Sequence, residues 1–215
     1  MERKNETEIL EGDDVPNELA SRAYRDLARI HRWLGDTRFV IRAIRQDPVR
    51  VRRILDVGCG TGLVSETIGR KLNVEVLGVD LNPRPSISTS VRVFRADAVR
   101  DSLPAADVAF SMLLGHHLSE DDLVELIRNV GRCCRRFILM DLVRHPLPLV
   151  LFRMCVAPFV CRTVVLDGQK SIRRSYSPAE LRRITALALA SSGGSFRHVV
   201  APLYARQVID ILYRE

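Results

Sequence analysis

Three glycines at alternate positions, Gly58, Gly60 and Gly62, constrain this chain more than any other feature. They follow a short apolar run over residues 53–57 that is typical of a buried strand, and they precede a helical stretch over residues 63–71. Without side chains, the backbone of such a turn can approach a ligand closely, and the start of the helix offers free N–H groups. The segment therefore predicts a strand, a tight turn and a helix that together bind a nucleotide-like ligand.

Strands and helices are expected to alternate along most of the chain. Strands are predicted over residues 53–57, 75–80, 91–95, 106–112, 136–141, 196–200 and 207–213, and helices over residues 16–46, 63–71, 121–130 and 178–189. The last two strands are expected to form an antiparallel pair at the sheet edge. The predicted fold class is α/β, with a Rossmann-like, doubly wound, mostly parallel seven-stranded sheet and helices on both faces.

The 215 residues suffice for one domain with a sizeable core. Within residues 1–215, four parts are expected: an N-terminal helical cap (1–46), a cofactor-binding core (51–141), a substrate or lid insertion (142–176), and a C-terminal helix with two strands (177–215). Disorder is expected only in the first dozen residues, which are charged and poor in apolar side chains.

The charge and cysteine content exclude several classes of protein. The net charge is +7 and the pI about 9.6, but the arginines are scattered and aromatic residues make up only 6%, so no nucleic acid partner is expected. Five cysteines without a CxxC pair suit neither zinc nor a disulfide framework, so we expect no metal and a reduced, cytoplasmic protein. The apolar stretch over residues 147–166 contains prolines and arginines, which makes it a poor transmembrane span.

The spacing of the glycines distinguishes between possible ligands. A dinucleotide-binding turn would have its third glycine at the position of Leu63. Asp56, inside the preceding strand, would repel a pyrophosphate but suits a ligand with an amino group and a sulfonium charge. These details argue against NAD or FAD and favour S-adenosylmethionine.

The string Ile54-Leu55-Asp56-Val57-Gly58-Cys59-Gly60-Thr61-Gly62 resembles the first motif of class I S-adenosylmethionine-dependent methyltransferases. Within that superfamily the chain is similar to the small-molecule methyltransferases of the quinone-biosynthesis type. The resemblance is good over residues 51–141 and weak in the final third. It implies S-adenosylmethionine as cofactor and S-adenosylhomocysteine as product. The cofactor contacts that we expect on this basis are Asp56, Gly58, Cys59, Gly60, Gly62, Asp80, Leu81, Asp97, Ala98, Ser111 and Met112.

Two acidic residues in this set have specific expected roles. Asp80 ends the second predicted strand, where a carboxylate can accept hydrogen bonds from both ribose hydroxyls. The resemblance places Asp97 opposite the adenine amino group. Each has a plainer alternative, because aspartate is also common in turns and at helix N-caps.

Three histidines are the candidates for catalysis. His116 and His117 belong to a His-His-Leu sequence on the loop after the fourth strand, as in the family, and His145 follows the fifth strand. All three are expected at the carboxyl edge of the sheet, where ligands bind in open α/β folds. A histidine there can remove a hydroxyl proton, or it can simply hold a loop or line the cofactor. His145 has the further alternative of bonding the turn before Pro146.

Other segments are expected near the acceptor. Tyr24, His31 and Trp33 lie on N-terminal helices that commonly close over the site in the family, although they can also be packing residues. The apolar segment 146–165 is interpreted as a hydrophobic lid, a membrane-contacting surface, or an extra core helix or dimer contact. Residues 167–176 are predicted to form a polar loop, which either delivers Arg173, Arg174 or Tyr176 to the pocket or lies in solvent.

The sequence thus predicts methyl transfer to a hydrophobic small molecule such as a phenol, quinol or polyketide, with oxygen as the preferred acceptor atom. The Asn/Asp-Pro-Pro-Tyr/Phe signature of amino-group methylation is absent, because Ser111-Met112-Leu113-Leu114 stands at that place. Carbon or nitrogen methylation of a small molecule, and a non-catalytic cofactor-binding protein, remain as alternatives. The expected partners are the acceptor and, at most, a peripheral membrane surface, and the chain is expected to be a monomer or homodimer.

Overall fold

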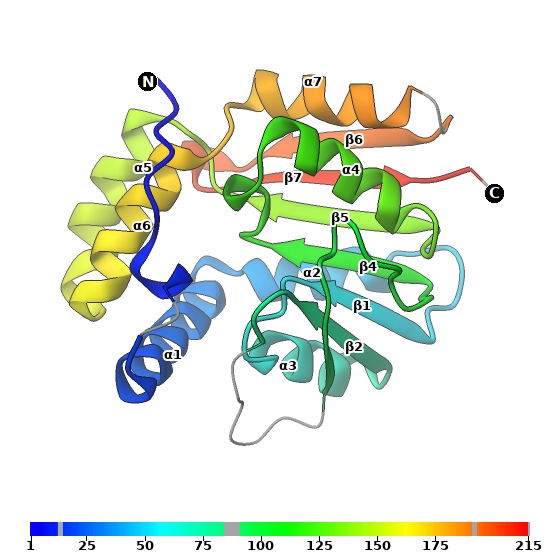
Figure 1. Cartoon of the computed structure of the whole chain (residues 1–215), viewed down its shortest axis with the longest axis horizontal. Coiled ribbons are helices and arrows are strands. Elements are labelled where there is room, and N and C mark those ends of the chain that lie inside the picture. Colours follow the sequence, from blue (N-terminus) through cyan, green and yellow to red (C-terminus); the bar gives the residue numbers. More distant parts are fainter. Residues whose placement is uncertain (13–14, 84–90, 191–192, 215) are drawn as a thin grey trace.

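The computed structural model of the chain describes residues 1–12, 15–83, 91–190 and 193–214. These residues form a seven-stranded sheet with the order β3-β2-β1-β4-β5-β7-β6 (Figure 1). Strands β1 to β5 run parallel, whereas β7 pairs antiparallel with β5 and β6. The strands are Arg53–Val57 (β1), Glu75–Asp80 (β2), Arg92–Arg95 (β3), Val108–Met112 (β4), Arg136–Asp141 (β5), Ser195–Val200 (β6) and Gln207–Leu212 (β7). The predicted Rossmann-like sheet is confirmed, including its antiparallel pair at one edge.

Helices cover both faces of the sheet. On one face lie α2 (Asp36–Arg45) and α3 (Leu63–Leu72), and on the other lie α4 (Glu120–Val130) and α7 (Pro178–Leu189). Successive residues of a strand point to opposite faces, so Ile54 packs in the core under α2 and α3 while Leu55 packs under α4 and α7. This explains why the strand sequences are apolar at nearly every position.

Three helices form a cap beyond the carboxyl ends of the parallel strands (Figure 1). They are α1 (Asn17–Leu34), α5 (Pro146–Leu151) and α6 (Arg162–Arg174). A π-helical turn (Phe152–Val156) and a 3-10 turn (Ala157–Phe159) connect α5 to α6. Ala23 and Ile30 of α1 pack on Val164 of α6 in a small core separate from the two sheet layers. The helix predicted over residues 16–46 is divided at Gly35, whose φ of 79° ends α1.

The structure corrects two predictions about the cap. The first dozen residues are not disordered: they lie along α6, where Arg3 donates to the carbonyl oxygens of Arg174 and Leu118. The segment predicted as a polar loop over residues 167–176 is largely the helical second half of α6. Its polar side chains have partners within the protein, because Asp167 accepts hydrogen bonds from the backbone N–H groups of Ile9 and Leu10. Both errors have one cause. The N-terminal residues and the second half of α6 are each polar enough to indicate a solvent-exposed segment, but in the structure they pack against each other.

Among the described residues, no helix is long and apolar enough to cross a membrane. All five cysteines are free thiols, including the adjacent Cys133 and Cys134, whose sulfur atoms lie 3.7 Å apart.

Candidate active site

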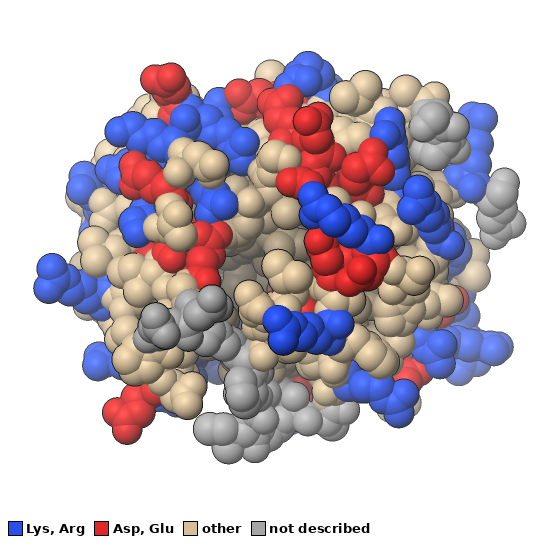
Figure 2. Space-filling model, in the orientation of Figure 1, with Lys and Arg blue, Asp and Glu red and all other residues tan. Residues whose placement is uncertain are grey.

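A cavity of about 560 Å³ lies between the carboxyl edge of the sheet and the cap. Its walls come from the glycine turn, the ends of β2 and β4, the loop after β4, α1, and the 3-10 turn Ile9–Glu11 of the N-terminal segment. Figure 2 shows the hollow near the middle of this face of the molecule, with acidic side chains on both of its sides. Because it sits at the carboxyl ends of parallel strands, it occupies the place where α/β folds bind their ligands.

The glycine turn forms one end of this cavity. Gly58, Gly60 and Gly62 have φ values of 77°, 55° and 72°, a region that residues with side chains rarely adopt. Space is also limited, because a Cβ atom on Gly58 would lie 3.1 Å from the side chain of Leu114. Gly62 caps α3, whose first turn begins at Leu63. The three glycines are therefore required by backbone geometry.

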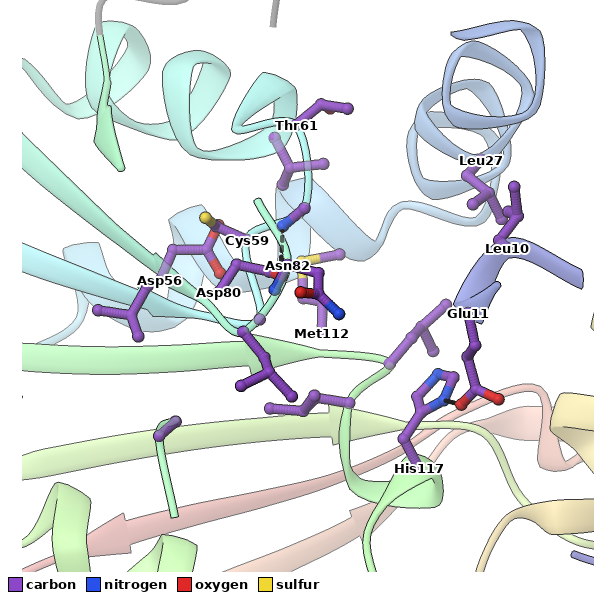
Figure 3. Close-up of a pocket in the computed structure, with 18 of the residues that line it drawn as sticks. Leu10, Glu11, Leu27, Asp56, Cys59, Thr61, Asp80, Asn82, Met112 and His117 are labelled. Atoms are coloured by element: carbon purple, nitrogen blue, oxygen red, sulfur yellow. Dashed lines mark hydrogen bonds and ion pairs between the residues drawn. The ribbon is translucent and has the colours of Figure 1, made fainter. Parts of the chain in front are cut away.

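Asp80 links the turn to the end of β2. One carboxylate oxygen accepts a hydrogen bond from the backbone N–H of Gly60 (2.8 Å), and the other accepts one from Asn82 (2.9 Å). Figure 3 shows Asp80 and Asn82 together beside the turn, lining the cavity. A carboxylate has about four acceptor positions, so two backbone bonds leave positions for a ligand.

Asp56 lies buried beneath the same turn and also lines the cavity. The hydroxyl of Ser65 donates to its carboxylate at 2.5 Å. Burial raises the pKa of Asp56 to about 7, the nearby charge of Asp80 adds to this, and the bond from Ser65 opposes it. A buried carboxylate with a raised pKa favours a cationic group brought next to it.

Asp97 follows β3 at the cavity wall and is partly exposed. Its carboxylate accepts hydrogen bonds from the backbone N–H of Val99 (2.9 Å) and from Arg100 (3.0 Å). Burial raises the pKa of Asp97, but these bonds outweigh that effect and hold it below its usual value. Asp97 thus holds the turn at residues 98–100, and the helix that the N-cap alternative requires does not follow it.

A pair of histidines forms the opposite end of the cavity, on the 3-10 turn Gly115–His117 after β4. His116 is buried, and its Nδ1 lies 2.7 Å from a carboxylate oxygen of Asp141. Its Nε2 lies 3.4 Å from Glu8 Oε1 and has no hydrogen-bond partner among the described residues. Burial alone would lower the pKa of His116, but the carboxylates of Asp141 and Glu8 raise it to about 9. In this state His116 carries a proton at neutral pH and is a poor base.

His117 is about one quarter exposed and faces the cavity (Figure 3). Its Nδ1 lies 2.5 Å from Glu11 Oε1, and its Nε2 lies 4.0 Å from Glu8 Oε2. Burial raises the pKa of Glu11, but the bond with His117 and others outweigh that effect and bring it to about 2. The rings of His116 and His117 lie with centroids 4.1 Å apart. Arg174 of α6 holds Glu11 in place at 2.6 Å.

Sequence reasoning missed Glu8 and Glu11. They belong to the segment predicted to be disordered, and their partners lie more than 100 residues further along the chain. The sequence offers one weak signal, the spacing of two carboxylates three residues apart before a helix. That spacing is too common to identify a site.

Some of the other expected site residues line the cavity and some do not. Cys59, Leu81, Ala98 and Met112 line the cavity, as do Tyr24 and His31 of α1. Ser111 lies behind it and joins β4 to β1 by donating to the carbonyl of Val57 (2.8 Å).

His145 is not brought to the cavity. Its Nδ1 accepts from the N–H of Leu147 at the start of α5, and its ring stacks on Tyr204. Trp33 packs against Phe159, outside the cavity. No residue of the apolar segment 146–165 lines the cavity, which α1 and the N-terminal segment cover instead. Of the interpretations given for this segment, the lid over the cavity therefore does not fit the structure.

Comparison with known proteins identifies relatives of this architecture. Residues 54–136 match the family model described as a methyltransferase domain. The plantazolicin methyltransferase BpumL, solved with S-adenosylhomocysteine, has a TM-score of 0.71 and 14% identity over 95% of this chain and 93% of that one. Magnesium protoporphyrin IX methyltransferase from Synechocystis PCC 6803, solved with S-adenosylmethionine, has a TM-score of 0.56 and 13% identity over 96% of this chain and 88% of that one. Among proteins with curated functions, none matches the sequence significantly.

Proposed function

We propose that the chain is a class I S-adenosylmethionine-dependent methyltransferase that methylates a hydroxyl group of a hydrophobic small molecule in this cavity. The match of residues 54–136 to a methyltransferase domain supports the proposal. The observation that carries the proposal is the contrast between the two ends of the cavity. The glycine turn with Asp80 stands at one end, and a pair of histidines held by carboxylates stands at the other, with apolar side chains between them (Figure 3).

The cofactor fits the end formed by the turn. Asp80 would accept hydrogen bonds from the ribose hydroxyls, and Asp97 would face the adenine. Asp56 would lie near the amino group, where its negative charge favours a cation. The sulfonium methyl would then point along the cavity toward Met112, Leu114 and His117.

The acceptor fits the remaining space. Leu10, Leu27 and Leu118 line this part of the cavity, and such a lining suits an aromatic or otherwise hydrophobic molecule. Two similar folds are named for acting on plantazolicin and on magnesium protoporphyrin IX, which supports a small-molecule or peptide acceptor.

Methyl transfer to oxygen is an in-line displacement at the sulfonium methyl. The acceptor oxygen loses its proton, forms the new O–C bond, and the C–S bond breaks to leave S-adenosylhomocysteine. Holding the two partners in contact in a dry pocket supplies much of the catalysis. The polar end of the cavity can help the acceptor hydroxyl to ionise in either of two ways. His117 would accept the hydroxyl proton, or a cation held by Glu8, His116 and His117 would stabilise the oxyanion.

The proposal is tested by incubating the protein with labelled S-adenosylmethionine and a panel of phenols and quinols. We expect His117→Ala to lose turnover by at least about tenfold while binding S-adenosylhomocysteine within about threefold of wild type. His145→Ala is the matched control and should retain turnover, because its ring lies outside the cavity.

Three other outcomes of these experiments would each contradict one part of the proposal. A labelled methyl group found by NMR on carbon or nitrogen would refute oxygen as the acceptor atom. Cofactor binding without transfer to any compound of the panel would favour a non-catalytic protein. Equal, small effects of both histidine substitutions would remove His117 from the chemistry.

The raised pKa of Asp56 gives a separate prediction for cofactor binding. The free protein has Asp56 mostly neutral at pH 6 and mostly ionised at pH 8, since its pKa is about 7. If the ionised form binds the cofactor's amino group, S-adenosylhomocysteine should bind about tenfold more tightly at pH 8 than at pH 6. Calorimetry on wild type and Asp56→Asn checks this, because the variant should show weaker binding with little dependence on pH. A wild-type Kd that is equal at both pH values would remove Asp56 from the cofactor site.

A further inference from the structure

Glu8, His116 and His117 bring three side chains of the kind that bind metal ions to one wall of the cavity. One ligand atom from each lies within 4.8 Å of the other two. Two of the three residues are buried, and His117 faces the open part of the cavity. The sequence did not predict a metal site, because Glu8 lies 108 positions before His116 and the three residues form no recognisable spacing.

Both histidine rings are oriented by a second carboxylate. Asp141 holds Nδ1 of His116 at 2.7 Å, and Glu11 holds Nδ1 of His117 at 2.5 Å. Histidines that bind metals almost always have their other nitrogen fixed in this manner. The arrangement leaves the Nε2 atoms of both rings near the Glu8 carboxylate, at 3.4 Å and 4.0 Å.

The distances suit a cation between these atoms. Two ligand atoms that each lie about 2.1 Å from a tetrahedral cation are about 3.4 Å apart. His116 Nε2 and Glu8 Oε1 have this separation, at which they form an ion pair but no well-aligned hydrogen bond. A cation bound between the two atoms would give this buried ring nitrogen a closer partner than the long ion pair does.

The charge around the cluster also suits a cation. Glu8, Glu11 and Asp141 bring three carboxylates, and Arg174 brings a single guanidinium in contact with Glu11. The three carboxylates outnumber the two positive groups, the guanidinium of Arg174 and the protonated ring of His116, so negative charge is in surplus around the cluster.

We propose that Glu8, His116 and His117 bind one divalent transition-metal ion, whose remaining coordination positions face the cavity. Two imidazoles and one carboxylate favour Zn²⁺, Co²⁺, Fe²⁺ or Mn²⁺ over Mg²⁺ and Ca²⁺, which prefer oxygen ligands. Binding displaces the proton from His116.

The role of the ion in catalysis rests on the proposed function. The acceptor hydroxyl binds the ion at an open position, and its pKa falls, so that its proton passes to water. The resulting oxyanion attacks the methyl carbon, and the C–S bond breaks to release S-adenosylhomocysteine.

Metal binding is tested first without any acceptor. The full chain is stripped of metal with a chelator, dialysed, and titrated with Co²⁺ while its visible absorption spectrum is recorded. We expect saturation at one ion per chain. Glu8→Gln, which can still accept the hydrogen bond from Ser171, should weaken Co²⁺ binding by roughly 100-fold, and so should His117→Ala. Glu2→Gln removes an exposed carboxylate from the same segment and should leave binding unchanged.

The outcomes separate this inference from the proposed function. A wild-type protein that shows no saturable Co²⁺ spectrum, or variants that bind Co²⁺ as wild type does, would overturn the metal site. Retained S-adenosylhomocysteine binding and an unchanged Tm show that a variant is folded, and His117→Ala, which is less buried, serves if Glu8→Gln unfolds. Metal binding without transfer to any phenol or quinol would leave the site in place and refute the proposed function. Phenol methylation at an unchanged rate in chelator would refute the catalytic role of the ion and leave the proposed function in place.

Discussion

Replacing Asp80 by alanine is expected to weaken S-adenosylhomocysteine binding on the order of 1,000-fold. On the proposed assignment, the substitution removes two hydrogen bonds that the carboxylate accepts from the ribose hydroxyls, each contributing about 1.5–3 kcal/mol. It also removes the acceptor for the N–H of Gly60, which holds the glycine turn in place. Both losses act on the bound cofactor, so calorimetric Kd values measured with purified protein report them directly.

Asp97→Ala is the matched control, because it removes a carboxylate from the same cavity wall. Asp97 is paired with Arg100 and the N–H of Val99, and its expected partner on the cofactor is one adenine amino group. We expect a loss of about tenfold or less. A larger loss for Asp97→Ala than for Asp80→Ala would show that the ribose partner has been assigned to the wrong residue.

The second large effect is expected on stability. Asp141→Ala should lower the free energy of unfolding by about 3–5 kcal/mol, the cost of leaving a buried charge without its partner. Asp141 accepts hydrogen bonds from the backbone N–H of His116, the ring of His116 and the backbone N–H of Leu142, each at 2.7 Å. All of these groups are buried and would lose their acceptor together.

Urea unfolding followed by circular dichroism measures this effect. Asp121→Ala is the control, because Asp121 is an exposed carboxylate in the first turn of α4, and its removal should cost under about 1 kcal/mol. Asp141→Asn should fall between wild type and Asp141→Ala, since the amide keeps one acceptor oxygen. A change below 1 kcal/mol for Asp141→Ala would show that the His116 loop does not depend on this carboxylate.

The fold and the cofactor end of the cavity could be predicted because their signals are local. The β1 strand, the glycine turn and α3 are continuous in the sequence, and the spacing of Gly58, Gly60 and Gly62 reflects the backbone of the turn itself. Asp80 follows from the end of the next strand. Each of these features depends on residues within about thirty positions of one another.

The acceptor end could not be predicted in the same way. Glu8 and Glu11 come to His116 and His117 only when the N-terminal segment packs on α6, and no periodic pattern in either segment indicates this. Polar residues such as Asp167 and Ser171 looked like a solvated loop because their hydrogen-bond partners lie about 160 positions away. The apolar segment 146–165 looked like a lid, but apolar character alone does not indicate which surface a helix covers.

The two ends of the cavity are built from different parts of the chain, and this affects how the acceptor preference of such enzymes can change. Most of the residues expected to hold the cofactor lie on the glycine turn and at the ends of central strands, whose other side chains form the core. Leu10, Leu27 and Ala28 at the acceptor end lie on a segment and a helix outside the sheet. Substitutions there can change the shape and polarity of the acceptor pocket while cofactor affinity is preserved. Mutant libraries for new acceptors should therefore begin with Leu10, Leu27 and Ala28 and leave Tyr24 unchanged, because its ring lies beside Gly60 of the glycine turn.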